Sequence, residues 1–337
     1  MIRLPMFWGR AAALCTLLTA CVTPAGPAKS PSDGGVTQAA RPADGRPLDL
    51  MGGGAGACEG AVVTRGGERF LALEDGTLLT RAPLRVRADG AARAYHPDSF
   101  QAGAILHRCN AGEVHLPDGT RYMGGASEAA CGRFERDVAR IAAAGWDDGS
   151  VGAVRWFGIA AEGAARVAGQ VVPRVRPVLA EDGFYVSRTP LRDEARRADD
   201  PSAYPDAARV PYVFTRRDQD VALGSFGVAL RARGCPSGRD CAPVPFVVAG
   251  RAASVGDGSI ALARASSGLA PTENLNRQNR YRGQADRPDL LYVFFGGAGA
   301  GFAGDSAARD AAAAFEAWGG ADRLAQCRRV FVPEAKD

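Results

Sequence analysis

Residues 77–90 read "TLLTRAPLRVRADG", and this stretch indicates what kind of fold to expect. Apolar residues at 84, 86 and 88 alternate with charged residues at 85, 87 and 89, as in a strand with one buried face. The Asp-Gly pair at 89–90 is typical of a tight turn. The stretch therefore predicts a β-strand that ends in a turn.

Similar stretches lie on both sides of it. Short apolar or alternating runs, separated by Gly, Asp and Pro turns, recur at 60–65, 69–74, 105–125, 153–160, 169–180, 183–191, 210–216, 223–233, 245–250 and 289–297. Helical spacing is found at 127–145, with Ser127 as N-cap, and at 306–319. Strands dominate, and no regular strand–helix alternation or internal repeat is present. We therefore predict one mainly β domain over residues 58–337, barrel-like with a few flanking helices and stabilised by disulfides.

The first residues are typical of an export signal. Arg3 and Arg10 flank an apolar core that is too short to span a bilayer, and "LTAC" at 18–21 resembles a bacterial lipobox. We predict a lipoprotein-type signal peptide over 1–21 with lipidation at Cys21; an ordinary secretory peptide or an uncleaved anchor is the alternative. Residues 22–57, rich in Pro, Gly and Ala, predict a flexible linker. The protein is thus expected to be exported, and either lipid-anchored to the bacterial cell envelope or secreted.

Eight cysteines are present, of which Cys15 and Cys21 lie in the predicted signal. The even number that remains suggests disulfides in an exported protein. Closeness along the chain gives two pairs and leaves one to join the ends of the domain. The expected disulfides are Cys235–Cys241, Cys109–Cys131 and Cys58–Cys327. No cysteine or histidine cluster has metal-ligand spacing, so no metal is expected.

The charge pattern and the glycines exclude two classes of ligand. The formal net charge is +4, with basic and acidic residues mixed and no basic run interleaved with aromatics, so nucleic acid is not expected. Gly299, Gly301 and Gly304 have the spacing of a dinucleotide-binding turn. The rest of a βαβαβ unit is missing, however, and a chain with 43 Gly meets this spacing easily. No cofactor is therefore expected.

Residues 86–99, "VRADGAARAYHPDS", form the densest polar cluster of the first half. Tyr and His side chains stack on sugar rings and hydrogen-bond to them. This makes Asp89, Tyr95 and His96 candidates for substrate binding. The alternative is a β-turn at Asp89 followed by a loop in which His96 satisfies backbone groups.

Residues 246–265 read "FVVAGRAASVGDGSIALARA": an apolar strand, a glycine-rich turn and an alanine-rich helix. Asp257 is the only acidic residue there. By itself it suits a helix N-cap, because a carboxylate accepts hydrogen bonds from free N–H groups at the positive end of the helix dipole.

Several stretches, taken in chain order, resemble the chitosanases of glycoside hydrolase family 75. They are "ADGAARAYHP", "GFYVSRTPLRD", "DPSAYPDAARVPYVF", "LGSFGVAL", the 246–265 segment and "DLLYVFF". The resemblance implies an exported, endo-acting, inverting hydrolase whose substrate is a polysaccharide, chitosan or a related amino-sugar polymer. It also places Asp257 where the family has a catalytic Glu, at the start of the helix.

The sequence departs from the family at the partner of this acid. An inverting mechanism needs two carboxyl groups about 6.5–9.5 Å apart. The position of the family's Asp falls on Gly250, or on Arg251 with a shift of one, and no acid lies between there and Asp257. The remaining candidates are Asp89, Asp182 and Asp240.

A second departure concerns the charge before the turn at 89–90. Arg85 and Arg87 stand where the family carries acids, which argues against a polycation as the ligand. Two functions stay open: a hydrolase-like protein that cleaves or binds an amino-sugar polysaccharide, and an inactive glycan- or protein-binding surface lipoprotein that keeps the hydrolase fold. A purely structural envelope lipoprotein would fit the anchor but leave the polar segments unexplained.

Overall fold

The computed structural model describes residues 58–100, 103–125, 127–232, 234–236, 241–296, 302, 304 and 306–331. The predicted signal peptide with Cys21, the linker, Asp240, Gly299 and Gly301 lie outside the described residues. Among the helices of the described ranges, none combines the length and the apolar character needed to cross a bilayer.

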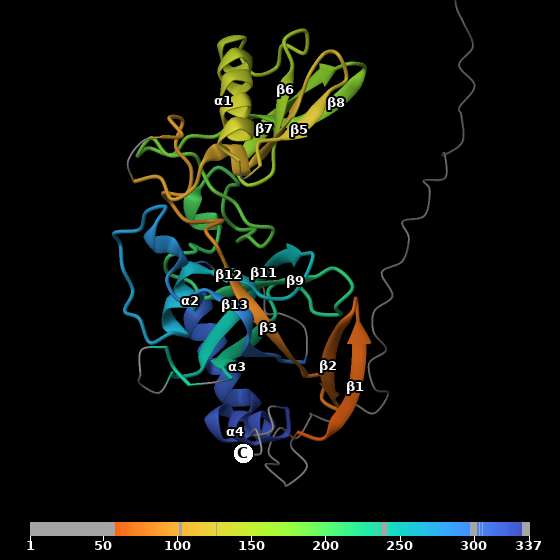
Figure 1. Ribbon diagram of the computed structural model, residues 1–337, viewed down its shortest axis with the longest axis vertical. Helices are drawn as coiled ribbons and strands as arrows, with labels where there is room; N and C mark the ends of the chain where they lie inside the picture. The colour runs from red at the N-terminus through yellow and green to blue at the C-terminus, as the bar shows by residue number, and fades with distance from the viewer. Residues whose placement is uncertain are drawn as a thin grey trace, which may run out of the picture. The chain divides into compact units, whose positions relative to one another are not determined.

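Six strands close into a barrel (Figure 1). In order around the barrel they are β3 (Leu78–Arg87), β12 (Asp257–Ser259), β9 (Tyr212–Arg216), β11 (Val244–Ala252), β10 (Phe226–Arg231) and β13 (Ala285–Phe294), which pairs back with β3. The β12–β3 and β11–β9 pairs are parallel and the others antiparallel. A hairpin of β1 (Gly60–Arg65) and β2 (Glu68–Leu73) extends the sheet from β3. The prediction of a mainly β, barrel-like domain is confirmed.

The alternation in β3 divides its side chains between the two faces of the barrel wall. Leu84 joins an interior cluster with Val213, Val248 and Tyr292, all buried. The other face of β3, β10 and β13 packs against α3 (Ala307–Trp318) and α4 (Gly320–Phe331). The predicted helix at 306–319 is confirmed as α3, whereas α4 was not anticipated.

A second group of elements lies apart from α3 and α4 (Figure 1). It contains a sheet of β4 (Gly112–His115), β5 (Arg121–Met123) and β6 (Ala153–Trp156), the helix α1 (Glu128–Ala143) and a hairpin of β7 (Ala161–Val167) and β8 (Gln170–Pro177). The predicted N-cap of α1 is confirmed, because the Ser127 side chain accepts a hydrogen bond from the Ala130 N–H at 3.2 Å. The apolar face of α1, with Phe134 and Ile141, is buried.

One predicted strand, at 183–191, does not form. The segment makes only isolated bridges, of Tyr185 with Tyr95 and Leu179 and of Ser187 with Ile159. The Ser187 hydroxyl instead accepts a hydrogen bond from the Gly90 N–H at 2.9 Å. The segment therefore packs between loops instead of pairing in a sheet, and an alternating sequence pattern does not distinguish the two cases.

All three predicted disulfides are present. Cys109–Cys131 joins the short helix η1 (Arg108–Asn110) to α1, and Cys58–Cys327 joins the chain before β1 to α4.

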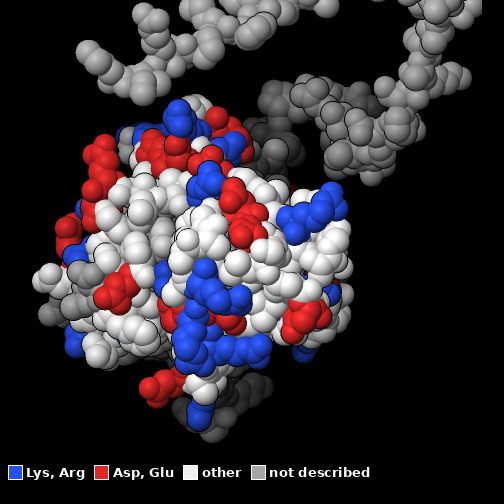
Figure 2. Space-filling model, turned by 90° about the horizontal axis from the view of Figure 1, so that it is seen from above, with Lys and Arg blue, Asp and Glu red and all other residues white. Residues whose placement is uncertain are grey.

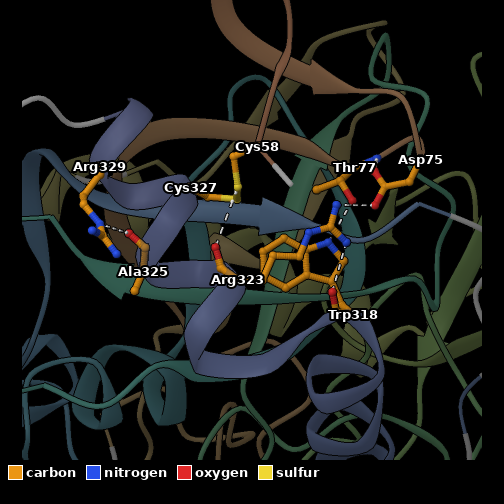
Figure 3. The surroundings of a disulfide bond; sticks show 8 residues. All are labelled: Cys58, Asp75, Thr77, Trp318, Arg323, Ala325, Cys327 and Arg329. Atoms are coloured by element: carbon orange, nitrogen blue, oxygen red, sulfur yellow. Dashed lines mark hydrogen bonds and ion pairs between the residues drawn. A yellow bond between two sulfur atoms is a disulfide. The ribbon is translucent and has the colours of Figure 1, made fainter. Parts of the chain in front are cut away.

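Polar contacts reinforce the closure at Cys58–Cys327 (Figure 3). The Trp318 indole N–H donates to the Thr77 hydroxyl at 3.0 Å, and the Arg323 guanidinium lies over the Trp318 ring and pairs with Asp75 at 2.6 Å. Burial alone would raise the pKa of Asp75, but hydrogen bonds from Thr77 and the pairing with Arg323 outweigh it and lower the pKa below its usual value.

Candidate functional site

Asp257 is the first residue of β12, and its side chain lies beside the charged side chains of β3. In the parallel register, Asp257 is opposite Arg85 and Ser259 is opposite Arg87. The Asp257 Oδ1 accepts from the Arg85 Nε at 2.9 Å, and its Oδ2 accepts from the Arg87 Nη1 at 3.2 Å. Both oxygens of this carboxylate are therefore held by guanidinium groups, and only 15% of the side chain is exposed.

The residue before it explains why β12 sits so close to β3. Gly256 has φ +108°, and a Cβ there would lie 2.1 Å from the Pro83 carbonyl oxygen. Only glycine allows this approach. The turn at Gly256 therefore sets the position of the Asp257 carboxylate against the two arginines.

Asp257 is not the cap of the following helix, α2 (Ile260–Ala265). The N-cap is Ser259, whose hydroxyl accepts from the Leu262 N–H at 3.1 Å and also from the Tyr212 N–H at 3.0 Å. The N-cap prediction for Asp257 was thus wrong by two residues, because pairing with β3 and β9 extends strand structure as far as Ser259.

Asp89, a predicted substrate-binding residue, belongs to the same charged group. The Arg87 Nε donates to the Asp89 Oδ2 at 2.7 Å, so one guanidinium joins Asp89 to Asp257. Since both carboxylates accept from one planar guanidinium, they lie close together, as the two acids of a glycoside hydrolase must. Burial lowers the pKa of Arg87, but the charges of the two carboxylates outweigh it and raise the pKa above its usual value. We call Arg85, Arg87, Asp89 and Asp257 the charged quartet.

Gly250, where the family resemblance expects a carboxylate, is a packing position. It pairs with Phe214 across β11 and β9, next to an irregularity in the register. A Cβ on Gly250 would lie 2.7 Å from the Phe214 ring, which is 4% exposed. The Arg87 guanidinium lies over the same ring, 4.9 Å from its centroid. The neighbouring Arg251 donates to the Thr215 hydroxyl at 2.5 Å and leaves no acid at this place either.

The other two predicted binding residues, Tyr95 and His96, are not part of the charged quartet. Tyr95 is a core residue with 2% of its surface exposed, and burial followed by the charge of Asp89 raises its pKa well above the usual value. It has no free face for a sugar ring, so its prediction as a binding residue was wrong. Tyr95 lies in a polar stretch of sequence, but its backbone forms a β-bridge with Tyr185, and its side chain is buried.

His96 follows the alternative interpretation of its segment. Its Nδ1 accepts from the Asp98 N–H at 3.0 Å, and its ring meets the edge of Phe184 at a centroid distance of 5.0 Å. The imidazole thus satisfies backbone in a loop, and it is half-buried.

The sequence offered two further acids as partners for Asp257. Asp182 accepts from the Phe184 N–H at 3.1 Å in a turn of its own and makes no contact with the quartet in the described part of the chain. Asp240 lies outside the described residues. Asp89 is therefore the acid that the structure brings to Asp257.

Sequence reasoning missed the residues that support this site from behind. The Tyr212 hydroxyl donates to the Asp89 carbonyl oxygen at 2.7 Å, and Phe214 supports Arg87. Both residues lie in the segment "VPYVF", for which the sequence pattern predicted only a strand. No local pattern distinguishes an aromatic that supports a charge from one that fills a core.

One group of described side chains has the spacing of metal ligands: Cys109, Cys131 and Glu135. The two sulfurs share a disulfide, and Glu135 pairs with Arg108 at 2.6 Å. The group has no thiolate to offer, so it does not fit a metal ion.

Comparison with protein-family models gave no match for this chain, and comparison with the curated proteins gave none either.

Proposed function

We propose that the protein is an exported glycan-binding protein, similar in fold to the family 75 chitosanases, that binds an amino-sugar polysaccharide without cleaving it by an inverting mechanism. The observation that carries this proposal is the state of the two acid positions. Gly250 is packed against Phe214, and both oxygens of Asp257 accept from guanidinium groups. A general acid needs a proton on an oxygen that faces the leaving group, and neither oxygen of Asp257 is free for it.

Export is supported by the signal-like N-terminus and by the disulfides. Structural disulfides persist in oxidising compartments outside the cytosol, and three are present here. In this proposal Cys21 carries the lipid that anchors the protein to the cell envelope. Replacing Cys21 with Ala should release the protein from the membrane fraction.

The charges around the site favour a particular kind of polymer. The side chains of Arg85 and Arg87 are 48% and 38% exposed beside Asp257. Two exposed guanidinium groups beside the acid repel a polycation. The face seen from above in Figure 2, at the α1 end of the molecule, mixes basic and acidic side chains and is not uniformly acidic either. A neutral or acidic amino-sugar polymer is therefore favoured over fully deacetylated chitosan.

A second function is favoured by one observation. Arg87 holds Asp89 beside Asp257, so a second acid lies next to the one that the resemblance assigns to catalysis. In that function Asp89 would replace the missing partner, and Arg87 would have to swing away when substrate binds.

One experiment separates the two functions. The purified protein is titrated with oligomers of N-acetylglucosamine and of glucosamine in a calorimeter, and the mixtures are analysed by mass spectrometry for shorter products. We expect binding without products. Shorter products that disappear in Asp257→Asn and in Asp89→Asn would establish the hydrolase, and absence of both heat and products would contradict both functions.

A further inference from the structure

The structure contains a pocket of about 250 Å³. Its first lining residues, at 91–93, come shortly after Asp89 of the charged quartet in the sequence. Part of its lining is apolar and part is polar. The apolar residues are Ala91, Ala92, Ile105, Ala208, Pro271 and Leu275. The polar residues are Arg93, Asp206, Arg209, Thr272 and Glu273. The volume is below the roughly 300–1,000 Å³ of pockets for drug-sized ligands, so it suits one small unit of a larger molecule.

The loop at 205–209, which lines the pocket, contacts the segments on either side of the quartet. Gly90 has φ +85°, and a Cβ there would lie 2.2 Å from the Pro205 carbonyl oxygen, so the loop at 205–209 packs directly on the turn after Asp89. The Ala261 N–H of α2 donates to the Ala207 carbonyl oxygen at 2.9 Å and ties the same loop to the helix that follows Asp257. The loop that lines the pocket is therefore fixed both to the turn after Asp89 and to the helix that follows Asp257.

The Asp206 carboxyl is the distinctive group of the pocket. Its Oδ1 accepts from the Ala208 N–H at 2.8 Å. Arg209 lies 3.9 Å from Oδ2 and is engaged by Glu273 at 3.1 Å, so within the described residues Oδ2 has no hydrogen-bond donor. Burial is the main influence on this group and raises the pKa of Asp206, against the Ala208 hydrogen bond and the charge of Arg209.

A half-buried acceptor beside apolar side chains selects a ligand that carries an N–H donor next to an apolar group. An acetamido group has both, with its methyl close to its amide N–H. A free ammonium group can also donate to Asp206, but it has no methyl to cover the apolar residues of the lining, and the two arginines and two acids of the lining leave no net negative charge to favour a cation.

We infer that this pocket binds the N-acetyl group of an amino-sugar unit, with the amide N–H donating to Asp206 and the methyl lying against Ile105 and Leu275. The inference rests on the proposed function and sharpens it: the ligand is an N-acetylated polymer, and the pocket is the subsite that distinguishes it from the deacetylated one.

Two variants and a matched control test the inference. Asp206→Asn keeps an oxygen to accept from Ala208 but turns the other acceptor into a donor. Ala208→Leu fills the pocket. Asp148→Asn is the control, because Asp148 makes a similar contact with the Ser150 N–H at 3.0 Å in the loop after α1.

The affinity of the full-length protein for N-acetylglucosamine oligomers is measured by calorimetry, with thermal unfolding of each variant as a check on folding. We expect a loss of about tenfold or more in both pocket variants and less than twofold in the control. Saturation-transfer NMR on the wild-type protein should show the acetyl methyl protons as the most strongly saturated protons of the ligand.

The outcomes distinguish the pocket from the proposed function. If the wild-type protein binds N-acetylated oligomers and the folded pocket variants bind them equally well, the pocket assignment is overturned while the proposed function stands. Tighter binding of deacetylated oligomers would also overturn it. If the wild-type protein binds no oligomer, the proposed function fails and the inference fails with it.

Discussion

Replacing Gly250 with Asp would put a carboxylate where the family resemblance expects one, and we predict that it destabilises the protein without creating an acid/base pair. The new Cβ would lie 2.7 Å from the Cε2 and Cζ atoms of Phe214. Phe214 is buried and also contacts the Arg87 guanidinium, so its ring has little room to move.

The size of the effect follows from these contacts. Overpacking a buried site costs about 1–3 kcal/mol, and a weakened cation–π contact between Phe214 and Arg87 adds about 0.5–1 kcal/mol. We therefore expect the free energy of unfolding of Gly250→Asp to fall by about 1.5–4 kcal/mol. With an unfolding entropy of about 2.1 cal/mol/K per residue, such a loss lowers the Tm of a domain of this size by roughly 3–7 °C.

Urea denaturation followed by circular dichroism measures this loss. Gly234→Ala is the control, since a Cβ there meets open space, and it should change stability by no more than about 0.5 kcal/mol. Gly250→Ala should cost at least about 1 kcal/mol less in a Phe214→Leu background than in the wild type, because the clashing ring is gone. A Gly250→Asp variant that is as stable as the wild type, or one that hydrolyses oligomers, would contradict this prediction.

Three further predictions concern the rest of the fold. Arg87→Gln should destabilise the protein by about 1–2 kcal/mol, since it leaves two carboxylates without their shared donor. Arg85→Gln should cost less than about 1 kcal/mol, because the Arg85 side chain is half exposed. Chemical denaturation measures both losses. Asp75, whose pKa is lowered in the fold, contributes stability that is present above about pH 4 and is lost as the pH falls through the folded-state pKa, so the stability of Asp75→Asn should fall less between pH 5 and pH 3. The double variant Cys109→Ser/Cys131→Ser should lose about 3 kcal/mol of stability, and added reductant should then change it less than it changes the wild type.

Features of the fold that depend on local signals could be predicted from the sequence. The alternation of apolar and charged residues at 84–89 determines which side of β3 faces the barrel interior, and the Ser127 cap marks the start of α1. The disulfide pairs followed from parity and closeness along the chain, because a short loop between two cysteines limits how far apart they can fold.

Features that depend on contacts between distant segments could not be predicted. Asp257 and Ser259 are both good N-caps, and the choice between them is made by the pairing of β12 with β3, about 170 residues earlier in the chain. The contact of Phe214 with Gly250 crosses two parallel strands, and the burial of Tyr95 depends on its bridge to Tyr185. The pocket at Asp206 needs four separate stretches of the chain to come together, none of which carries a recognisable motif.

Binding without cleavage is tested most directly with the purified wild-type protein in excess over an N-acetylglucosamine hexamer, at a concentration where calorimetry shows the hexamer to be bound. The mixture is incubated for a day and analysed by mass spectrometry. We predict that the hexamer is recovered intact, because Gly250 cannot supply the second acid and the arginines occupy Asp257. Conversion to shorter oligomers by the wild-type protein, abolished in Asp257→Asn, would contradict the claim that this site binds without cleaving.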